Sequence, residues 1–162
     1  MQKVTPFLWF DKNAEEAINF YTSVFKDSKI ISINRYPDGP LEGPMKGMEG
    51  KVITGIFELG GQRFMALDGG PMFKFTEAVS FLVKCEDQEE VDYFWNKLTE
   101  DGEESQCGWL KDKYGLSWQV FPTILQKLMS DPDQEKSQRV VQAFMKMKKF
   151  DIAQLLQAYN GN

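Results

Sequence analysis

Side chains that commonly carry out chemistry in proteins are sparse in this sequence. The 162 residues include no histidine and two cysteines, Cys85 and Cys107. Neither a zinc site of the usual spacing nor a disulfide framework is indicated, because both need clustered cysteines or histidines. General acid–base catalysis works best with a group that titrates near neutral pH, and histidine is the usual one. The residue types therefore weaken a catalytic interpretation from the start.

Cys107 is a candidate reactive thiol, but a reactive thiol needs a cationic or dipolar neighbour to lower its pKa. Lys111 is near in sequence, but a strand could point it elsewhere, so a buried inert thiol is the preferred interpretation. The acidic pairs at 15–16 and 89–90 fall in the first turns of predicted helices. We interpret them as solvated partners of the helix dipoles rather than as acid–base pairs.

The hydrophobic patterns predict two runs of elements in the same order. In the first half a strand, a helix and three strands are expected at Val4–Phe10, Ala14–Phe25, Ile30–Arg35, Lys51–Leu59 and Gln62–Leu67. In the second half a strand, a helix and two strands are expected at Val79–Lys84, Asp87–Leu98, Cys107–Lys111 and Ser117–Phe121, with the polar segment 101–106 as a candidate short edge strand. The simplest account is an internal βαβββ duplication in an α+β protein.

The predicted organisation is one domain followed by a helical extension. Residues 1–122 form the domain, with modules of about 1–71 and 72–122, and residues 123–162 form the extension. Amphipathic patterns predict helices in the extension at Ile124–Met129, Gln134–Lys148 and Asp151–Tyr159. The Gly- and Pro-rich segment Pro37–Gly50 reads as a long loop.

Composition limits the classes of partner. The chain is 42% hydrophobic and 14% aromatic, with a formal charge of −5 and a pI near 4.9. A packed core is expected, whereas nucleic acid and anionic membrane surfaces are not expected partners. No apolar run approaches the ~20 residues that span a bilayer, and the N-terminus lacks the pattern of a secretion signal. We expect a cytoplasmic protein.

Several blocks of the sequence resemble a known superfamily. They are Thr5–Phe10, Asp68–Pro71, Val83–Asp92, Cys107–Asp112, Ser117–Gln119 and Met147–Ile152. They resemble the vicinal oxygen chelate superfamily, which includes glyoxalase and bleomycin-resistance proteins, and within it the PhnB-like group labelled 3-demethylubiquinone-9 3-methyltransferase. The resemblance implies the glyoxalase-like fold of paired βαβββ modules and a homodimer. The methyltransferase label is not supported by the residues, because neither double glycine, at 60–61 or 69–70, opens a helix as a nucleotide-binding turn does.

Metal-dependent members of the superfamily place four strand residues around a divalent ion. Here the resemblance puts those positions at Pro6, Ala78, Gln119 and the segment Met65–Leu67. A divalent ion needs anionic or imidazole ligands to offset its dehydration, and this set offers one neutral amide oxygen. We therefore predict a vacant metal site and no cofactor.

Without a metal the cavity could still hold a small molecule. Strand alternation is expected to place Leu8, Phe10, Ser80, Ser117 and Gln119 around it, with Cys107 and Trp109 as further candidate ligand-binding residues. The same side chains could instead simply fill the cleft.

Two functions from different classes remain open. The preferred one is a metal-free small-molecule-binding protein. The alternative is an enzyme of unknown reaction on a small, partly aromatic metabolite.

Overall fold

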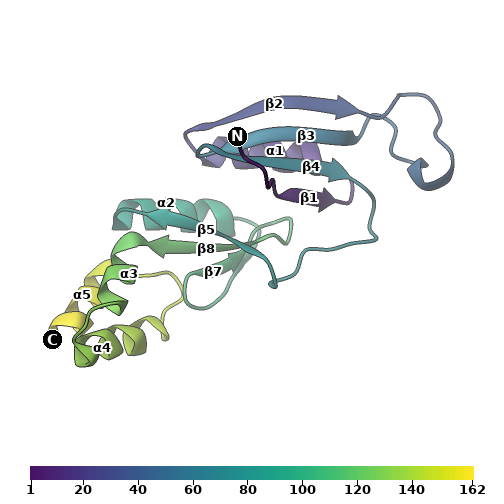
Figure 1. Ribbon diagram of the computed structural model, residues 1–162. Helices are drawn as coiled ribbons and strands as arrows, with labels where there is room; N and C mark the ends of the chain where they lie inside the picture. The colour runs from purple at the N-terminus through teal and green to yellow at the C-terminus, as the bar shows by residue number, and fades with distance from the viewer. The chain divides into compact units, whose positions relative to one another are not determined.

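The computed structural model describes all 162 residues, which form two compact units, residues 1–75 and 76–162. Each unit contains one four-stranded mixed sheet, and the second unit also holds three C-terminal helices (Figure 1). The predicted α+β class and the repeated βαβββ order are confirmed. None of the helices has the length and apolarity that a bilayer crossing requires.

The first unit follows the predicted element order closely. Its elements are β1 (Phe7–Phe10), α1 (Ala14–Val24), β2 (Ser28–Arg35), the 3-10 turn η1 (Gly43–Met45), β3 (Val52–Leu59) and β4 (Gln62–Asp68). The strand order is β1-β4-β3-β2, with β1 parallel to β4 and the other neighbours antiparallel. The double glycine at 60–61 forms the tight hairpin between β3 and β4, as expected from its φ angles of 53° and 81°.

Helix α1 packs closely on its sheet because one strand position lacks a side chain. A Cβ atom added to Gly55 would lie 2.5 Å from Cδ1 of Ile18, which is fully buried. Gly55 pairs directly with Ala66, and Ala66 pairs with Leu8. Directly paired residues point to the same side of a sheet, so these three residues define the face that α1 covers.

The start of α1 is held by a residue far away in sequence. Asn13 is the N-cap residue but makes no capping bond with its side chain. Instead, Oδ1 of the buried Asp68 accepts a hydrogen bond from Ala14 N at 2.9 Å, and its Oδ2 accepts one from Val52 N at 2.9 Å. Asp68 thereby joins β4, α1 and β3, and supplies the acceptor that a local cap would supply.

The second unit repeats the topology. Its sheet elements are β5 (Ser80–Cys85), α2 (Gln88–Thr99), β6 (Glu103–Glu104), β7 (Trp109–Lys111) and β8 (Ser117–Pro122). The order β5-β8-β7-β6 matches that of the first sheet, with β5 parallel to β8. The candidate edge strand is present as the two-residue β6. Asp87 caps α2 by accepting a bond from Glu90 N at 2.9 Å, as the acidic first turn suggests.

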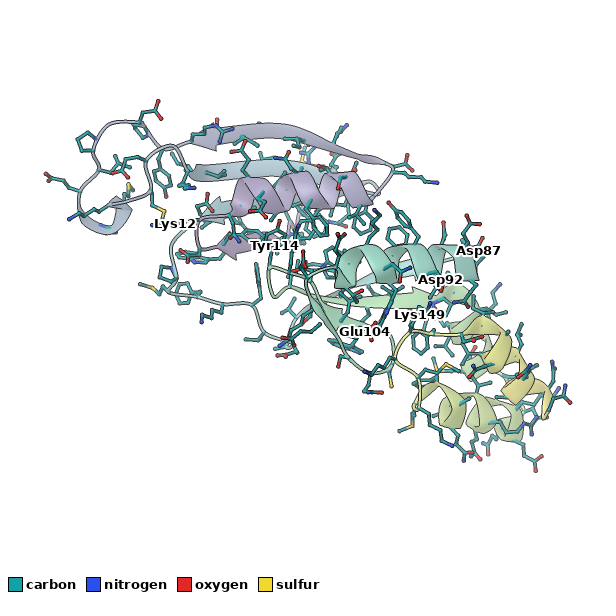
Figure 2. The ribbon with its side chains drawn as sticks, turned by 180° about the vertical axis from the view of Figure 1, so that it is seen from behind. Lys12, Asp87, Asp92, Glu104, Tyr114 and Lys149 are labelled. Atoms are coloured by element: carbon teal, nitrogen blue, oxygen red, sulfur yellow. The ribbon has the colours of Figure 1, made fainter.

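The C-terminal helices α3 (Thr123–Met129), α4 (Gln134–Phe144) and α5 (Ile152–Asn160) surround a small core of their own. Its buried members are Leu125, Leu128, Val140, Phe150 and Leu155. The amide of Gln88 on α2 donates to Phe150 O at 3.0 Å and accepts from Ile152 N at 2.8 Å. Asp92 of α2 lies beside Lys149, with 2.7 Å between Oδ1 and Nζ (Figure 2). These bonds attach the helices to the second sheet unit.

The predicted helix Gln134–Lys148 was too long, because α4 ends at Phe144. The chain turns there, with Met147 N donating to Phe144 O at 3.0 Å. The turn places the carbonyls of Met147 and Lys148 where they accept from the amides of Cys107 and Gly108, both at 2.8 Å. The segment after α4 therefore pairs with the residues just before β7.

Candidate ligand-binding face

The first sheet places two predicted site residues in its core. Leu8 lies on the face that α1 covers, and Phe10, two residues along the same strand, shares that face. Leu8 is 5% exposed and Phe10 is 3% exposed. Leu8 and Phe10 were expected on a pocket wall, but they lie on the face of the sheet that packs against α1. Their neighbours Phe7 and Trp9 point to the opposite face.

The second sheet brings four of the other predicted residues, Ser80, Ser117, Gln119 and Trp109, together in two rows. Strand pairing aligns Ser80, Ser117, Lys111 and Glu103 across all four strands. A second row aligns Leu82, Gln119 and Trp109. The Gln119 Nε2 donates to Ser80 Oγ at 2.9 Å, which links the two rows. The buried apolar residues of β8, Trp118 and Val120, alternate with this polar set and so point to the opposite face.

Ser117 is unusual within this face. The residue is 0% exposed, and its Oγ is the one buried side-chain polar atom without a hydrogen-bond partner. Asp112, also buried, shows the normal situation, since its carboxylate accepts from Tyr114 N at 2.8 Å, Leu116 N at 3.1 Å and Trp118 Nε1 at 2.8 Å. Buried polar groups are nearly always paired. The Ser117 hydroxyl is an exception to this rule within the chain.

A cavity of about 350 Å³ opens on the same face. Its lining residues are Glu77, Glu103, Glu104, Ser105, Trp109, Leu110, Lys111 and Ser117. The Lys111 ammonium forms an ion pair with Glu77, which raises the pKa of Lys111 and lowers the pKa of Glu77. Glu104 accepts a bond from Trp95 Nε1 at 3.1 Å, so it braces α2 against the edge strand (Figure 2). The volume lies within the range of small-molecule pockets.

The acidic and cationic lining residues were missed by sequence reasoning. Glu103 and Glu104 belong to the segment predicted as a candidate edge strand, and Lys111 ends a predicted strand, but none of the three was predicted to line the cavity. The sequence signal for them was the candidate edge strand at 101–106, and the structure supplies the register that places Glu103 beside Lys111. That register depends on the tertiary pairing of β6 with β7, which the sequence leaves open.

Cys107 does not lie on this face. The predicted strand Cys107–Lys111 begins only at Trp109, and Cys107 has a φ of 56°. Its Sγ lies 3.8 Å from Phe144 O and 3.9 Å from Met145 O, beside the core of the C-terminal helices. Cys107 was expected in the pocket, and the structure places it beside the C-terminal helices instead. Cys85 is fully buried, and that burial raises the pKa of its thiol to about 12, so it is not a reactive nucleophile either.

Known proteins with the same sequence features and fold support a family assignment. The family model of 3-demethylubiquinone-9 3-methyltransferase matches residues 2–121. A Bacillus cereus PhnB protein described by that methyltransferase name is 46% identical, with 75% of this chain and 100% of that chain covered and a TM-score of 0.68. The chain belongs to this family. The PhnB-like group lies in the vicinal oxygen chelate superfamily, as the sequence resemblance implied. No curated protein matches the chain.

More distant structures share the fold alone. The protein PA1353 from Pseudomonas aeruginosa is 19% identical over 75% of this chain and 98% of its own, with a TM-score of 0.64. The fosfomycin resistance protein FosX from Listeria monocytogenes, solved with Mn(II) and sulfate, is 13% identical over 79% and 97% of the two chains, with a TM-score of 0.52. The family match ends at residue 121, so the three C-terminal helices lie outside it. The matched region is therefore shorter than the resemblance drawn from the sequence, which included Met147–Ile152.

A divalent metal, which the superfamily implies, does not fit the residues of this PhnB-like chain. Gln119 offers a neutral amide whose nitrogen is bonded to Ser80. Ala78 precedes β5 and has no side-chain donor, and the Pro6 carbonyl accepts from Met65 N at 2.9 Å. Within either unit no three His, Cys, Asp or Glu side chains gather closely enough to hold a metal ion. The buried carboxylates Asp68 and Asp112 are engaged by N–H donors, and neither belongs to a group of ligands that could hold a divalent ion.

Proposed function

We propose that this PhnB-like protein binds a small molecule, without a resident metal, on the face of its second sheet that α2 leaves uncovered. The observation that carries the proposal is the Ser117 hydroxyl, which is buried at the cavity without a partner. An unsatisfied buried hydroxyl costs roughly 1–3 kcal/mol. A ligand that forms a hydrogen bond with Ser117 recovers that cost on binding.

The surroundings of Ser117 suit a ligand with both polar and apolar parts. Trp109 supplies an aromatic wall, and Gln119 has its amide fixed by Ser80, which leaves Oε1 as an acceptor in a defined orientation. Few and oriented polar groups beside an aromatic surface are typical of small-molecule sites. Of the residues predicted from the sequence, Ser80, Ser117, Gln119 and Trp109 are the proposed ligand-binding residues.

The enzyme alternative has no specific observation in its favour. The ion pair with Glu77 keeps Lys111 protonated, so Lys111 is not a general base. Ser117 has no hydrogen-bonded base to activate it as a nucleophile. Methyl transfer from a nucleotide donor is likewise not proposed, because the double glycine at 60–61 joins two strands and that at 69–70 follows β4 without opening a helix.

We also propose that the chain forms a homodimer. The support is an apolar row on the first sheet, on the face that α1 leaves uncovered, formed by Phe7, Met65 and Ile56. Phe7 is 48% exposed, and exposed apolar rows of this kind commonly mark association surfaces. Sedimentation velocity at micromolar concentration is expected to give one dimer species, and a monomer would contradict the proposal.

The binding function is tested by protein-observed NMR with a chemically mixed fragment library. We expect shifts concentrated on the backbone amides of Trp109, Lys111, Ser117 and Gln119. The variant Ser117→Ala should weaken those shifts, while Ser130→Ala, which removes an exposed hydroxyl after α3, should preserve them. No fragment binding at this face would refute the function. A stoichiometric metal in the purified protein would refute its metal-free character.

A further inference from the structure

The charges around the cavity point to the class of its ligand, an inference that rests on the proposed binding function. Three of the lining residues are glutamates and one is a lysine. The single cation is not available to an anionic ligand, because Lys111 is already paired with Glu77. The whole chain is also acidic, with a formal charge of −5. An anion entering this cavity would meet an excess of negative charge at short range.

Glu103 is the carboxylate that remains for a ligand. It lies opposite Lys111 in the β6–β7 pairing, and so in the same row as Ser117. Glu77 is occupied by Lys111 and Glu104 by the Trp95 indole. The side chain of Glu103 makes no hydrogen bond or ion pair of its own, although its charge helps to raise the pKa of Lys111. An ammonium group beside Glu103 would gain a charge-assisted hydrogen bond.

The remaining two features of the cavity suit the rest of such a ligand. Trp109 belongs to the neighbouring row and lines the cavity, so its indole can contact an apolar or aromatic body and attract a nearby cation. Ser117 presents the buried unpartnered hydroxyl, which can donate or accept. The volume of about 350 Å³ is roughly twelve times the ~30 Å³ share of a liquid water molecule, which fits a ligand of modest size.

We propose that the cavity on the second sheet selects small organic cations, namely amines with a short apolar or aromatic body. The ammonium group lies at Glu103. The hydroxyl of Ser117 forms a hydrogen bond with a second polar group of the ligand or with the ammonium itself. Neutral analogues bind more weakly and carboxylates are rejected. The selectivity comes from Glu103, whereas Ser117 contributes to the binding of every class.

Three probes of the same shape test the proposal: 2-phenylethylamine, 2-phenylethanol and 3-phenylpropanoate, titrated into the full chain and followed on the amides of Lys111 and Ser117. We expect the amine to bind about fivefold more tightly than the alcohol, the gain typical of one partly exposed ion pair. The carboxylate should give no shift at this face. Raising the salt concentration should weaken the binding of the amine and leave the binding of the alcohol unchanged.

Charge-neutral variants then assign the selectivity. Glu103→Gln should reduce amine affinity to that of the alcohol and leave the alcohol unchanged. Glu100→Gln, the same change at an exposed residue after α2, should alter neither. Equal binding of amine and alcohol, or tighter binding of the carboxylate, overturns the charge class but leaves a ligand site on this face. If none of the probes and no library fragment shifts these amides, the binding function itself fails, so the two failures are distinguishable.

Discussion

The two βαβββ units share one topology but differ in the face that their helix leaves uncovered. In the first sheet that face carries Phe7, Met65 and Ile56, which are apolar. In the second sheet it carries Ser80, Ser117, Lys111 and Glu103 in one row. The comparison shows that one fold unit, used twice, carries an apolar row on this face in one copy and a polar row in the other.

Each unit also contains one buried aspartate that joins elements. Asp68 accepts hydrogen bonds from the backbone N–H groups of Ala14 and Val52. Asp112 accepts hydrogen bonds from two backbone N–H groups and from the Trp118 indole. Both carboxylates are thus structural. Ser117 differs from both aspartates, because its buried hydroxyl has no hydrogen-bond partner.

The largest expected effect is at Asp112. Asp112→Ala removes the acceptor of three donors, and we expect the free energy of unfolding to fall by about 4 kcal/mol, because each bond to a charged acceptor contributes ~1.5–3 kcal/mol and the loss is partly relaxed by water. Urea denaturation measures the change. A loss below about 1 kcal/mol would show that the turn does not depend on this carboxylate.

Asp68→Ala should come next, with a loss of about 3 kcal/mol, since two donors rather than three are left unpaired. Hydrogen exchange should show the damage in α1 and at the start of β3, where Ala14 and Val52 lie. Equal exchange in both units would contradict the view that each aspartate supports its own unit. Asp38→Ala, an exposed aspartate in the loop before β3, is the matched control.

A smaller effect is expected at the helix–sheet contact of the first unit. Gly55→Ala should cost about 1–3 kcal/mol by overpacking, because the new methyl would meet Ile18. Adding Ile18→Val removes the clashing Cδ1 atom and should recover part of the loss in a double-mutant cycle. Strict additivity of the two substitutions would refute the contact as the cause.

The smallest effect, and the one of opposite sign, is expected at Ser117. In the absence of ligand, Ser117→Ala should stabilise the protein by up to about 1 kcal/mol, because it removes a buried hydroxyl that has no partner. The urea midpoint of ligand-free protein measures this. A destabilised variant would mean that the hydroxyl has a partner, which would remove the observation on which the proposed function rests.

Sequence reasoning succeeded where polarity alternates and failed where it does not. In β8 the residues Ser117, Trp118, Gln119 and Val120 alternate between polar and apolar, so their faces could be assigned in advance. In β1 the residues Phe7, Leu8, Trp9 and Phe10 are all apolar, so the pattern carries no information on parity. Leu8 and Phe10 were accordingly predicted on the wrong face. Cys107 was misplaced because its left-handed backbone and its contact with the C-terminal helices depend on residues about 40 positions later.

The sequence by itself determined the order of the elements, the duplication and the family, since these follow from local periodicity and from short residue blocks. Only the tertiary structure decided which side chains share a face and which polar groups remain unpaired. Asp68 caps a helix that begins 54 residues earlier, and Glu103 meets Lys111 through an edge pairing only two residues long. The physical reason is that hydrogen-bond satisfaction and strand register are properties of the assembled chain. A local pattern indicates which groups need partners, but only the fold brings those partners to them. The fold can also leave a group without a partner, as it does at Ser117.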